Sequence, residues 1–164
     1  MENEHGMVAA GNVGVETIAS ADNTLSADRH SLSAPSLWRS PMNTEAMAKR
    51  LVELCRKGEY EQAQRELYAP DAVSIEMPGA PAGALGDAKG LEAIYEKGRQ
   101  FAAMVETMHG GTVSDPLVTG NWFSVAMSMD VTFKGRGRTQ MSELCVYHVH
   151  GGKVVSEQFF YDMG

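Results

Sequence analysis

The sequence has few cysteines and little positive charge, and both shortages narrow what the protein can be. The 164 residues include two cysteines, Cys55 and Cys145, which are too few for a disulfide framework or a structural zinc site. The formal net charge is −7, so the basic surface that nucleic acids and anionic membranes attract is missing. We therefore expect neither a nucleic-acid partner nor a membrane partner, and a reduced protein in the cytoplasm.

Long apolar runs are missing as well. No stretch reaches the roughly 18 consecutive apolar residues of a membrane span. The basic start and apolar run of a secretory signal are also absent, which agrees with a cytoplasmic location. The apolar fraction of 43% is ordinary for a globular protein, and the length fits one domain.

Residues 1–41 differ in composition from the rest of the chain. They are rich in Ala, Ser and Gly, and their apolar residues follow neither a helical nor a strand period. Such a segment buries too little apolar surface to offset the entropy lost on ordering its backbone. We expect a disordered N-terminal extension over 1–41, with a functional arm as the alternative, and a folded domain over 42–164.

The folded region opens with helix signals. Thr44 is predicted as the N-cap of a first helix that ends at Gly58. Residues 59–68 are predicted as a second helix, and the alternating residues 72–77 as a short strand. A Gly-, Pro- and Ala-rich loop over 78–90 suggests a flexible rim or lid.

A third helix follows, and then the apolar period changes from 3.6 to two. Strands are predicted at 105–114, 121–134, 138–150 and 153–162. The connections between them are too short for parallel crossovers, so we expect an antiparallel sheet. Three helices followed by such a sheet make an α+β domain with the helices on one sheet face.

The strand 121–134 shows which side chains face the helices. Its odd-numbered residues from Phe123 to Phe133 are all apolar, whereas its even-numbered residues are mostly small or polar. Side chains alternate between the faces of a strand, so the odd set is predicted to face the helices. Trp122 and Asp130 then belong to the outer face.

Three stretches carry a resemblance to a known family. They are 67–76 (Leu-Tyr-Ala-Pro-Asp-Ala-Val-Ser-Ile-Glu), 90–94 (Gly-Leu-Glu-Ala-Ile) and the aromatic final hairpin 147–162. In this order they resemble SnoaL-like proteins of the nuclear transport factor 2-like superfamily, over about 44–162. The resemblance implies a cone-shaped fold whose strongly curved sheet encloses a mainly apolar pocket. It also implies a homodimer formed through the outer sheet face, with Trp122 as a candidate contact.

Glu76 is the first candidate for chemistry. It follows the Ala-Pro-Asp-Ala-Val-Ser-Ile stretch, at the place where ketosteroid isomerase, which the chain resembles weakly, has its general-base carboxylate. An acid at a strand end beneath a loop can lose water and gain a useful pKa. The alternative is a solvated carboxylate. Leu51 and Cys145 stand where the isomerase has its oxyanion-binding phenol and acid, so the resemblance disfavours steroid isomerisation.

Glu143 and Glu157 share strand parity with aromatic residues and are predicted to face inward. Their available partners are Tyr147, Tyr161 and His109, because a buried carboxylate needs a partner or becomes neutral. The alternative is a bulge that reverses the facing and exposes the acids. His109, before two glycines, is either an acid or base at the pocket wall or a hydrogen-bonded structural residue.

Two further histidines could form a metal pair. His148 and His150 share one strand face, but their parity is outward and no third ligand is evident, so we expect no metal. The Gly-rich loop 79–86 lacks the ending of a phosphate-binding loop.

These observations predict a SnoaL-like small-molecule pocket protein that needs no cofactor. As an enzyme it would move a proton on an apolar, carbonyl-bearing ligand, in isomerisation, cyclisation or dehydration. The alternatives are a non-catalytic ligand-binding or dimerisation module and a protein-binding adaptor. The candidate catalytic residues are Glu76, Glu143, Glu157 and His109. The expected pocket lining is Tyr95, Met127, Met129, Cys145, Tyr147, Phe159 and Tyr161.

Overall fold

The computed structural model describes residues 42–80 and 85–161. Within them the helices are α1 (Thr44–Arg56), α2 (Tyr60–Leu67) and α3 (Leu91–Met104). The strands are β1 (Tyr68–Ile75), β2 (Ala88–Lys89), β3 (Val105–Val113), β4 (Leu117–Thr119), β5 (Trp122–Phe133), β6 (Gly137–His150) and β7 (Lys153–Tyr161). The extension predicted over 1–41 and residues 81–84 of the predicted loop lie outside the described residues.

The strands form one curled, unclosed sheet. Its order is β2-β1-β7-β6-β5-β3, with β4 paired to β5. The pairs formed among β3, β5, β6 and β7 are antiparallel, as predicted. β1 pairs with β7 in parallel, so the sheet is mixed, and the prediction of a wholly antiparallel sheet is wrong for this pair. The prediction came from the lengths of short connections, whereas β1 and β7 are joined through most of the domain.

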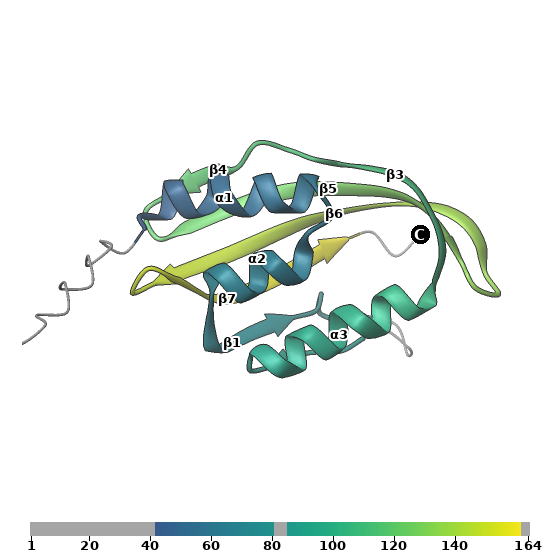
Figure 1. Ribbon diagram of the computed structural model, residues 1–164, viewed down its shortest axis with the longest axis horizontal. Coiled ribbons are helices and arrows are strands. Elements are labelled where there is room, and N and C mark those ends of the chain that lie inside the picture. The colour runs from purple at the N-terminus through teal and green to yellow at the C-terminus, as the bar shows by residue number, and fades with distance from the viewer. Residues whose placement is uncertain (1–41, 81–84, 162–164) are drawn as a thin grey trace, which may run out of the picture. The chain divides into compact units, whose positions relative to one another are not determined.

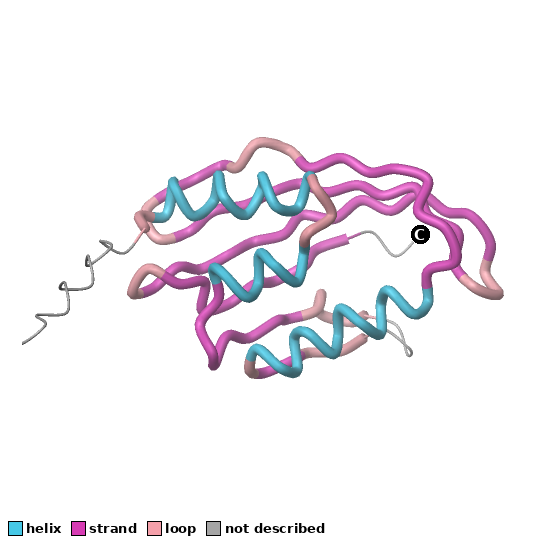
Figure 2. Tube along the Cα trace, in the orientation of Figure 1, coloured by secondary structure: helices cyan, strands magenta, loops and turns pink. Residues whose placement is uncertain are grey.

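The helices lie together against the sheet (Figures 1 and 2). α1 contacts β3, β4 and β5, while α3 contacts β1, β2 and β3. We call the sheet face that these helices cover the inner face and the opposite one the outer face. None of the helices in the described ranges is long and apolar enough to cross a membrane.

Local sequence explains where the helices begin. The side chain of Asn43 accepts a hydrogen bond from the backbone N–H of Ala46 at 2.8 Å, so Asn43, not Thr44, caps α1. Before α3, Gly90 adopts φ 89° and ψ 148°, a backbone conformation almost confined to glycine. Its N–H donates to the carbonyl of Ala72 at 2.8 Å, which ties the start of α3 to β1.

The two shortest strands were not predicted. β2 lies inside the predicted loop and pairs with β1, and β4 pairs with β5. With two and three residues, neither is long enough to display a period of two. β1 also starts earlier than expected, at Tyr68, because the chain becomes extended directly after α2.

The predicted facing of β5 is confirmed. Phe123, Val125 and Val131 are at most 1% exposed, on the inner face, whereas Trp122 is 47% exposed on the outer face. The rings of Phe123 and Tyr147 stack across β5 and β6 with their centroids 4.6 Å apart. The core therefore lies between the inner face and the helices. It includes Met47, Leu51, Leu67, Ile94, Phe123, Val125, Cys145, Tyr147, Val149 and Val154.

Burial decreases along the same strands beyond this core. Several inner-face side chains of β5, β6 and β7 remain partly exposed although they point to the helix side of the sheet. They are Met127, Met129, Met141, Glu143, Phe159 and Tyr161. We call these six residues the open inner face. They give the sheet a mostly apolar surface with a carboxyl and a phenol, which is the composition of a small-molecule site.

Candidate functional site

A polar cluster lies beside the open inner face. We define it by the side chains that hydrogen bonds and an ion pair connect, namely Tyr68, Ser74, Glu76, Lys97, Glu157 and Tyr161. Its members come from β1, α3 and β7. β1 and β7 are parallel neighbours, so their C-terminal ends lie side by side at the same end of the sheet (Figure 1). This topology brings together Glu76, just after β1, and Tyr161, which ends β7.

Glu76 is held by two donors. The Lys97 ammonium lies 2.5 Å from its Oε1, and the Tyr161 hydroxyl donates to its Oε2 at 2.8 Å. The side chains of Lys97 and Glu76 are 10% and 13% exposed, so the pair is largely removed from water. The backbone N–H of Glu76 also donates to the Asp87 carboxylate at 2.8 Å. The carboxylate is therefore fixed in one orientation.

Lys97 extends the cluster into the core. Its ammonium donates to the hydroxyl of Ser74 at 3.0 Å, and Ser74 is fully buried. Next to it, the Tyr68 hydroxyl donates to Glu157, which is 4% exposed. Burial raises the pKa of Glu157, against hydrogen bonding from Tyr68 and Ser74, which lowers it. Glu157 is thus an inward carboxyl with neutral donors around it.

Glu143 is the third carboxyl of this region. Burial is the main cause that raises its pKa, and the thiol of Cys145 opposes this by donating to Oε1 at 3.5 Å. Glu76 and Glu157 raise the pKa of Glu143 further by repulsion. Three ionised carboxyls would leave two negative charges uncompensated by the single ammonium of Lys97. The site therefore favours retention of a proton.

Tyr161 completes the arrangement as a hydrogen-bond donor. Burial, followed by its hydrogen bond to Glu76, raises the pKa of the Tyr161 phenol to about 12. The phenol thus stays protonated near neutral pH. Together, the three carboxyls, the ammonium and the phenol supply groups that can accept, retain and donate protons without a cofactor.

His109 is not brought to this site. β3 has an irregularity between Met108 and Gly110, and the exposed His109 ring hydrogen-bonds to the hydroxyl of Thr132 at 2.7 Å. Thr132 has the even parity of the outer face. The structure thus gives His109 a hydrogen bond to an outer-face threonine and not to an inward glutamate, and its role as an acid or base stays a prediction.

The expected pocket-lining residues divide into two groups. Met127, Met129, Phe159 and Tyr161 belong to the open inner face. Cys145, Tyr147 and Tyr95 are instead buried by packing.

Lys97 is the member of the cluster that sequence reasoning missed. It lies three residues after Ile94 and four before Phe101, two apolar residues of the α3 stripe. Residues at this spacing share a helix face. A lysine at the edge of an apolar stripe, in the same domain as unpaired inward acids, is the signal that could have identified it.

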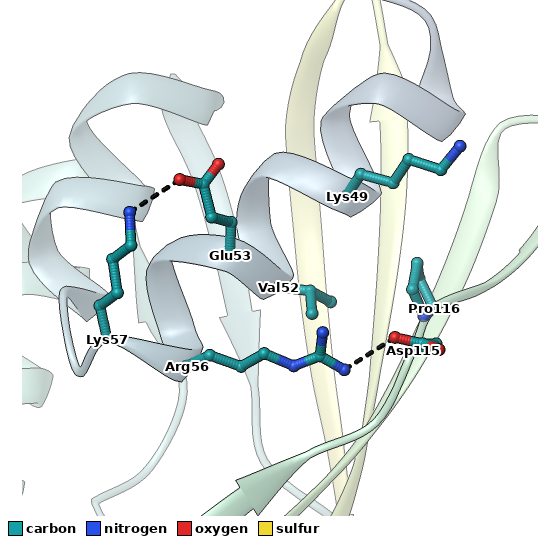
Figure 3. Close-up of a pocket in the computed structure, with 7 residues that line it drawn as sticks. All are labelled: Lys49, Val52, Glu53, Arg56, Lys57, Asp115 and Pro116. Carbon is teal, nitrogen blue, oxygen red and sulfur yellow. Dashed lines mark hydrogen bonds and ion pairs between the residues drawn. The ribbon is translucent and has the colours of Figure 1, made fainter.

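Two hollows of the described structure differ in their relation to this site. One, of about 340 Å³, is formed by α1 and the segment after β3 (Figure 3). Its cations are already paired: Arg56 lies 2.7 Å from Asp115, and Lys57 lies 2.7 Å from Glu53. These ion pairs are exposed and contribute little to a specific site. This hollow is lined by Lys49, Val52, Glu53, Arg56, Lys57, Asp115 and Pro116.

The second hollow, of about 650 Å³, is lined mainly by residues of β3, β5, β6 and β7. Several of its lining residues belong to the outer face, including Ala126, Ser128, Ser142, Leu144 and Phe160. Met127 and Glu143 of the open inner face line it as well, and so does Tyr161. Glu76, Lys97 and Glu157 line neither hollow. The polar cluster meets both the second hollow and the open inner face at one residue, Tyr161.

Metal-binding groups are not assembled in the described ranges. Residues 42–80 and 85–161 contain no group of three or more His, Cys, Asp or Glu side chains placed to hold an ion. On the outer face, the His148 ring stacks on Trp122, with centroids 4.1 Å apart and planes 10° apart.

The fold defines the class of protein. A curled, unclosed sheet covered by three helices is the nuclear transport factor 2-like fold. A nuclear transport factor 2-like protein from Burkholderia pseudomallei has a TM-score of 0.61 at 17% identity, covering 74% of this chain and 92% of that one. A ketosteroid isomerase-like protein from Catenulispora acidiphila, in complex with trimethylamine, has a TM-score of 0.56 at 17% identity, covering 74% and 88%. These identities show the fold alone.

The family follows from closer matches. The family model of the SnoaL-like domain matches residues 42–161. A Mesorhizobium loti protein, named as a candidate SnoaL-like polyketide cyclase and also as a carbohydrate phosphatase, is 33% identical with a TM-score of 0.67. The match covers 73% of this chain and 100% of the Mesorhizobium loti chain. No curated protein matches the sequence. The chain belongs to the SnoaL-like family, and its fold supports a small-molecule pocket protein.

Proposed function

We propose that the protein binds a small, apolar, carbonyl-bearing molecule on the open inner face and transfers a proton on it. Glu76 is the general base, and no cofactor takes part. The observation that carries this proposal is the placement of Glu76. Its carboxylate is held by Lys97 at 2.5 Å and by Tyr161 at 2.8 Å, beside a methionine-rich surface. Fixed orientation and exclusion of water are what a carboxylate base requires.

The remaining acids suit the second half of such a reaction. The base removes a proton from a carbon next to the carbonyl, and a protonated group must return one to the product. The raised pKa values of Glu143 and Glu157 favour protonated carboxyls in the same region. Isomerisation, cyclisation and dehydration all begin with such a proton removal. They then need a proton at carbon, at the new alkoxide or at the departing hydroxyl, respectively. The polyketide cyclase name of the 33% identical protein is consistent with them.

The alternative is a binding module without turnover. Glu157 and its partner Tyr68 are buried in a way that a purely structural hydrogen bond would explain as well. In that case the open inner face still binds an apolar ligand, but the carboxyls perform no chemistry.

Proton exchange with solvent separates the two functions. The probe is 2-tetralone, an apolar ketone with acidic hydrogens next to its carbonyl, followed by proton NMR in D₂O. We expect the protein to accelerate deuterium uptake and Glu76→Gln to reduce the acceleration by about a hundredfold or more. The matched control is Glu45→Gln. It removes a carboxylate that pairs with Lys49 at 2.7 Å on the solvent-exposed side of α1.

Binding is read separately from the methyl NMR signals of Met127, Met129 and Met141. Shifted methyl signals with no exchange would favour the binding module. Exchange that survives in Glu76→Gln would contradict the role of Glu76, and the absence of both exchange and methyl shifts would contradict the whole proposal.

A second copy of the chain is the proposed macromolecular partner. The family resemblance implies pairing through the outer sheet face, and this face exposes large apolar side chains. Trp122, Leu144 and Phe160 are 47%, 44% and 39% exposed. Exposed apolar side chains that gather on one face are typical of interfaces. The proposed location of the homodimer is the cytoplasm, where the two free thiols would stay reduced.

A further inference from the structure

Lys97 has more hydrogen-bonding capacity than the cluster uses. An ammonium group carries three N–H donors. The ion pair with Glu76 and the hydrogen bond to Ser74 account for two of them. Among the residues that the structure describes, no acceptor is assigned to the third. The Lys97 side chain is nevertheless only 10% exposed, so water cannot fully solvate this donor.

An aromatic ring lies on another side of the same ammonium. The Nζ of Lys97 is 5.1 Å from the centroid of the Phe159 ring, within the range of a cation–π contact. Phe159 belongs to the open inner face. The ammonium therefore lies at the boundary between the polar cluster and the apolar surface, where the polar atom of an apolar ligand would meet it.

The charge around Lys97 suits an oxygen that becomes negative only during the reaction. Glu76 contacts the Lys97 ammonium, and the positive charge of Lys97 also lowers the pKa values of Glu143 and Glu157. An oxygen that gains charge as a proton moves to Glu76 takes over part of the attraction that the carboxylate loses. Charge-assisted hydrogen bonds are about twice as strong as neutral ones, so the contact strengthens as charge develops.

We propose that Lys97 is the catalytic residue that binds the ligand's oxygen, and that the ligand is an enolisable ketone. This inference rests on the proposed function. The C–H bond next to the carbonyl breaks, and its proton moves to Glu76. The electron pair forms a carbon–carbon double bond, and the carbonyl oxygen becomes an enolate held by the third N–H of Lys97. Return of a proton to another carbon, or to the same one, completes the reaction without an oxidant or reductant. If Glu76 returns its own proton, its carboxylate is restored directly; if Glu143 or Glu157 supplies the proton, the proton on Glu76 replaces it there.

Binding of 4-nitrophenol tests the proposal without turnover. This phenol resembles an enol, and its anion is yellow, so absorbance reports how much of the bound probe is ionised. We expect the wild-type protein to favour the anion, and Lys97→Gln to weaken binding of the anion by about tenfold. Lys97→Arg, which keeps the charge, restores most of the affinity. The matched control is Lys49→Gln, because Lys49 is also paired with a glutamate but is exposed on α1.

Glu76→Gln provides a second test that leaves Lys97 intact. This variant removes the carboxylate that competes for the ammonium, so we expect the nitrophenol anion to bind more tightly although tetralone exchange is lost. Unchanged or weaker binding in Glu76→Gln would overturn the proposal, and this variant decides the matter if Lys97→Gln does not fold.

The two proposals fail in different ways. If Lys97→Gln abolishes binding of the anion but the wild-type protein exchanges no deuterium, Lys97 recognises the oxygen and the proposed catalysis is wrong. If Glu76 is needed for exchange but Lys97→Gln binds the anion as the wild type does, the catalysis stands and the role of Lys97 is overturned.

Discussion

Glu157 stabilises the fold best when it carries a proton. Burial raises its pKa above the ordinary value of 4.5. Its folded form therefore binds the proton more tightly than its unfolded form, and this stabilisation is complete below pH 4.5 and lost as pH rises through the folded-state pKa. We expect Glu157→Gln, which is neutral at every pH, to become progressively more stable relative to the wild type over that rise. Chemical unfolding at several pH values measures the difference.

The control for this prediction removes a charge without touching the core. Glu106→Gln lies at an exposed position of β3. A stability difference between Glu157→Gln and wild type that stays constant with pH would contradict the assignment of Glu157 as a carboxyl that burial keeps protonated.

Single residues were predictable where strand alternation applied. The period of two places Glu143 and Glu157 on the inner face, and the structure has both there. In β3 the pairing is irregular at two places, between Val105 and Thr107 and between Met108 and Gly110, so a count of residues along the strand does not give the face of His109. The ion pair of Lys97 with Glu76 joins a helix to a strand end, and no local period of the sequence encodes a contact of that kind.

At the scale of single elements, β3 depends on two neighbouring glycines in unequal ways. A Cβ atom on Gly111 would lie 2.7 Å from the backbone carbonyl oxygen of Ser128 on β5, whereas one on Gly110 would meet nothing within 4 Å. Backbone cannot move aside as a flexible side chain can. We expect Gly111→Ala to lower the free energy of unfolding by roughly 1–3 kcal/mol, measured by urea denaturation. Gly110→Ala is the matched control and should change stability much less.

An equal loss in both glycine variants would show that the close approach of β3 to β5 is not what requires Gly111. The pairing itself was predictable, because β3, β5, β6 and β7 have long alternating patterns and short turns. The partner of β1 was not, because a pairing between the first and last long strands depends on the whole chain. That unpredicted pairing is also what places Glu76 beside Tyr161.

At the scale of the whole molecule, the outer face sets the expected oligomeric state. We expect a dimer by light scattering, and monomers for Trp122→Asp and Phe160→Asp, because a buried unpaired charge opposes association. Met108→Asp is the control: Met108 is 50% exposed, close to the 47% of Trp122, but lies opposite Val131, which is an inner-face residue. A wild-type monomer, or dimers that survive both outer-face substitutions, would contradict this interface.

The general architecture was predictable from the order of the helices and strands along the chain and from the lengths of their connections. Few folds are compatible with helices followed by a meander of strands. The positions of the hollows did not. They depend on side-chain sizes at several strands at once, such as the small Ala126, Ser128 and Ser142 beside the larger Phe160. Sequence patterns report which face a residue occupies but not how much space remains above it.

The parallel pairing of β1 with β7 has a consequence for the order of assembly. The hydrogen bond between Tyr161 and Glu76 joins residues 85 positions apart in the sequence, and the hydrogen bond between Tyr68 and Glu157 joins residues 89 positions apart. Contacts this distant in the chain form late. During synthesis, β1 can therefore pair only with the two-residue β2 until β7 has left the ribosome, and a chain that stops short of β7 lacks both hydrogen bonds.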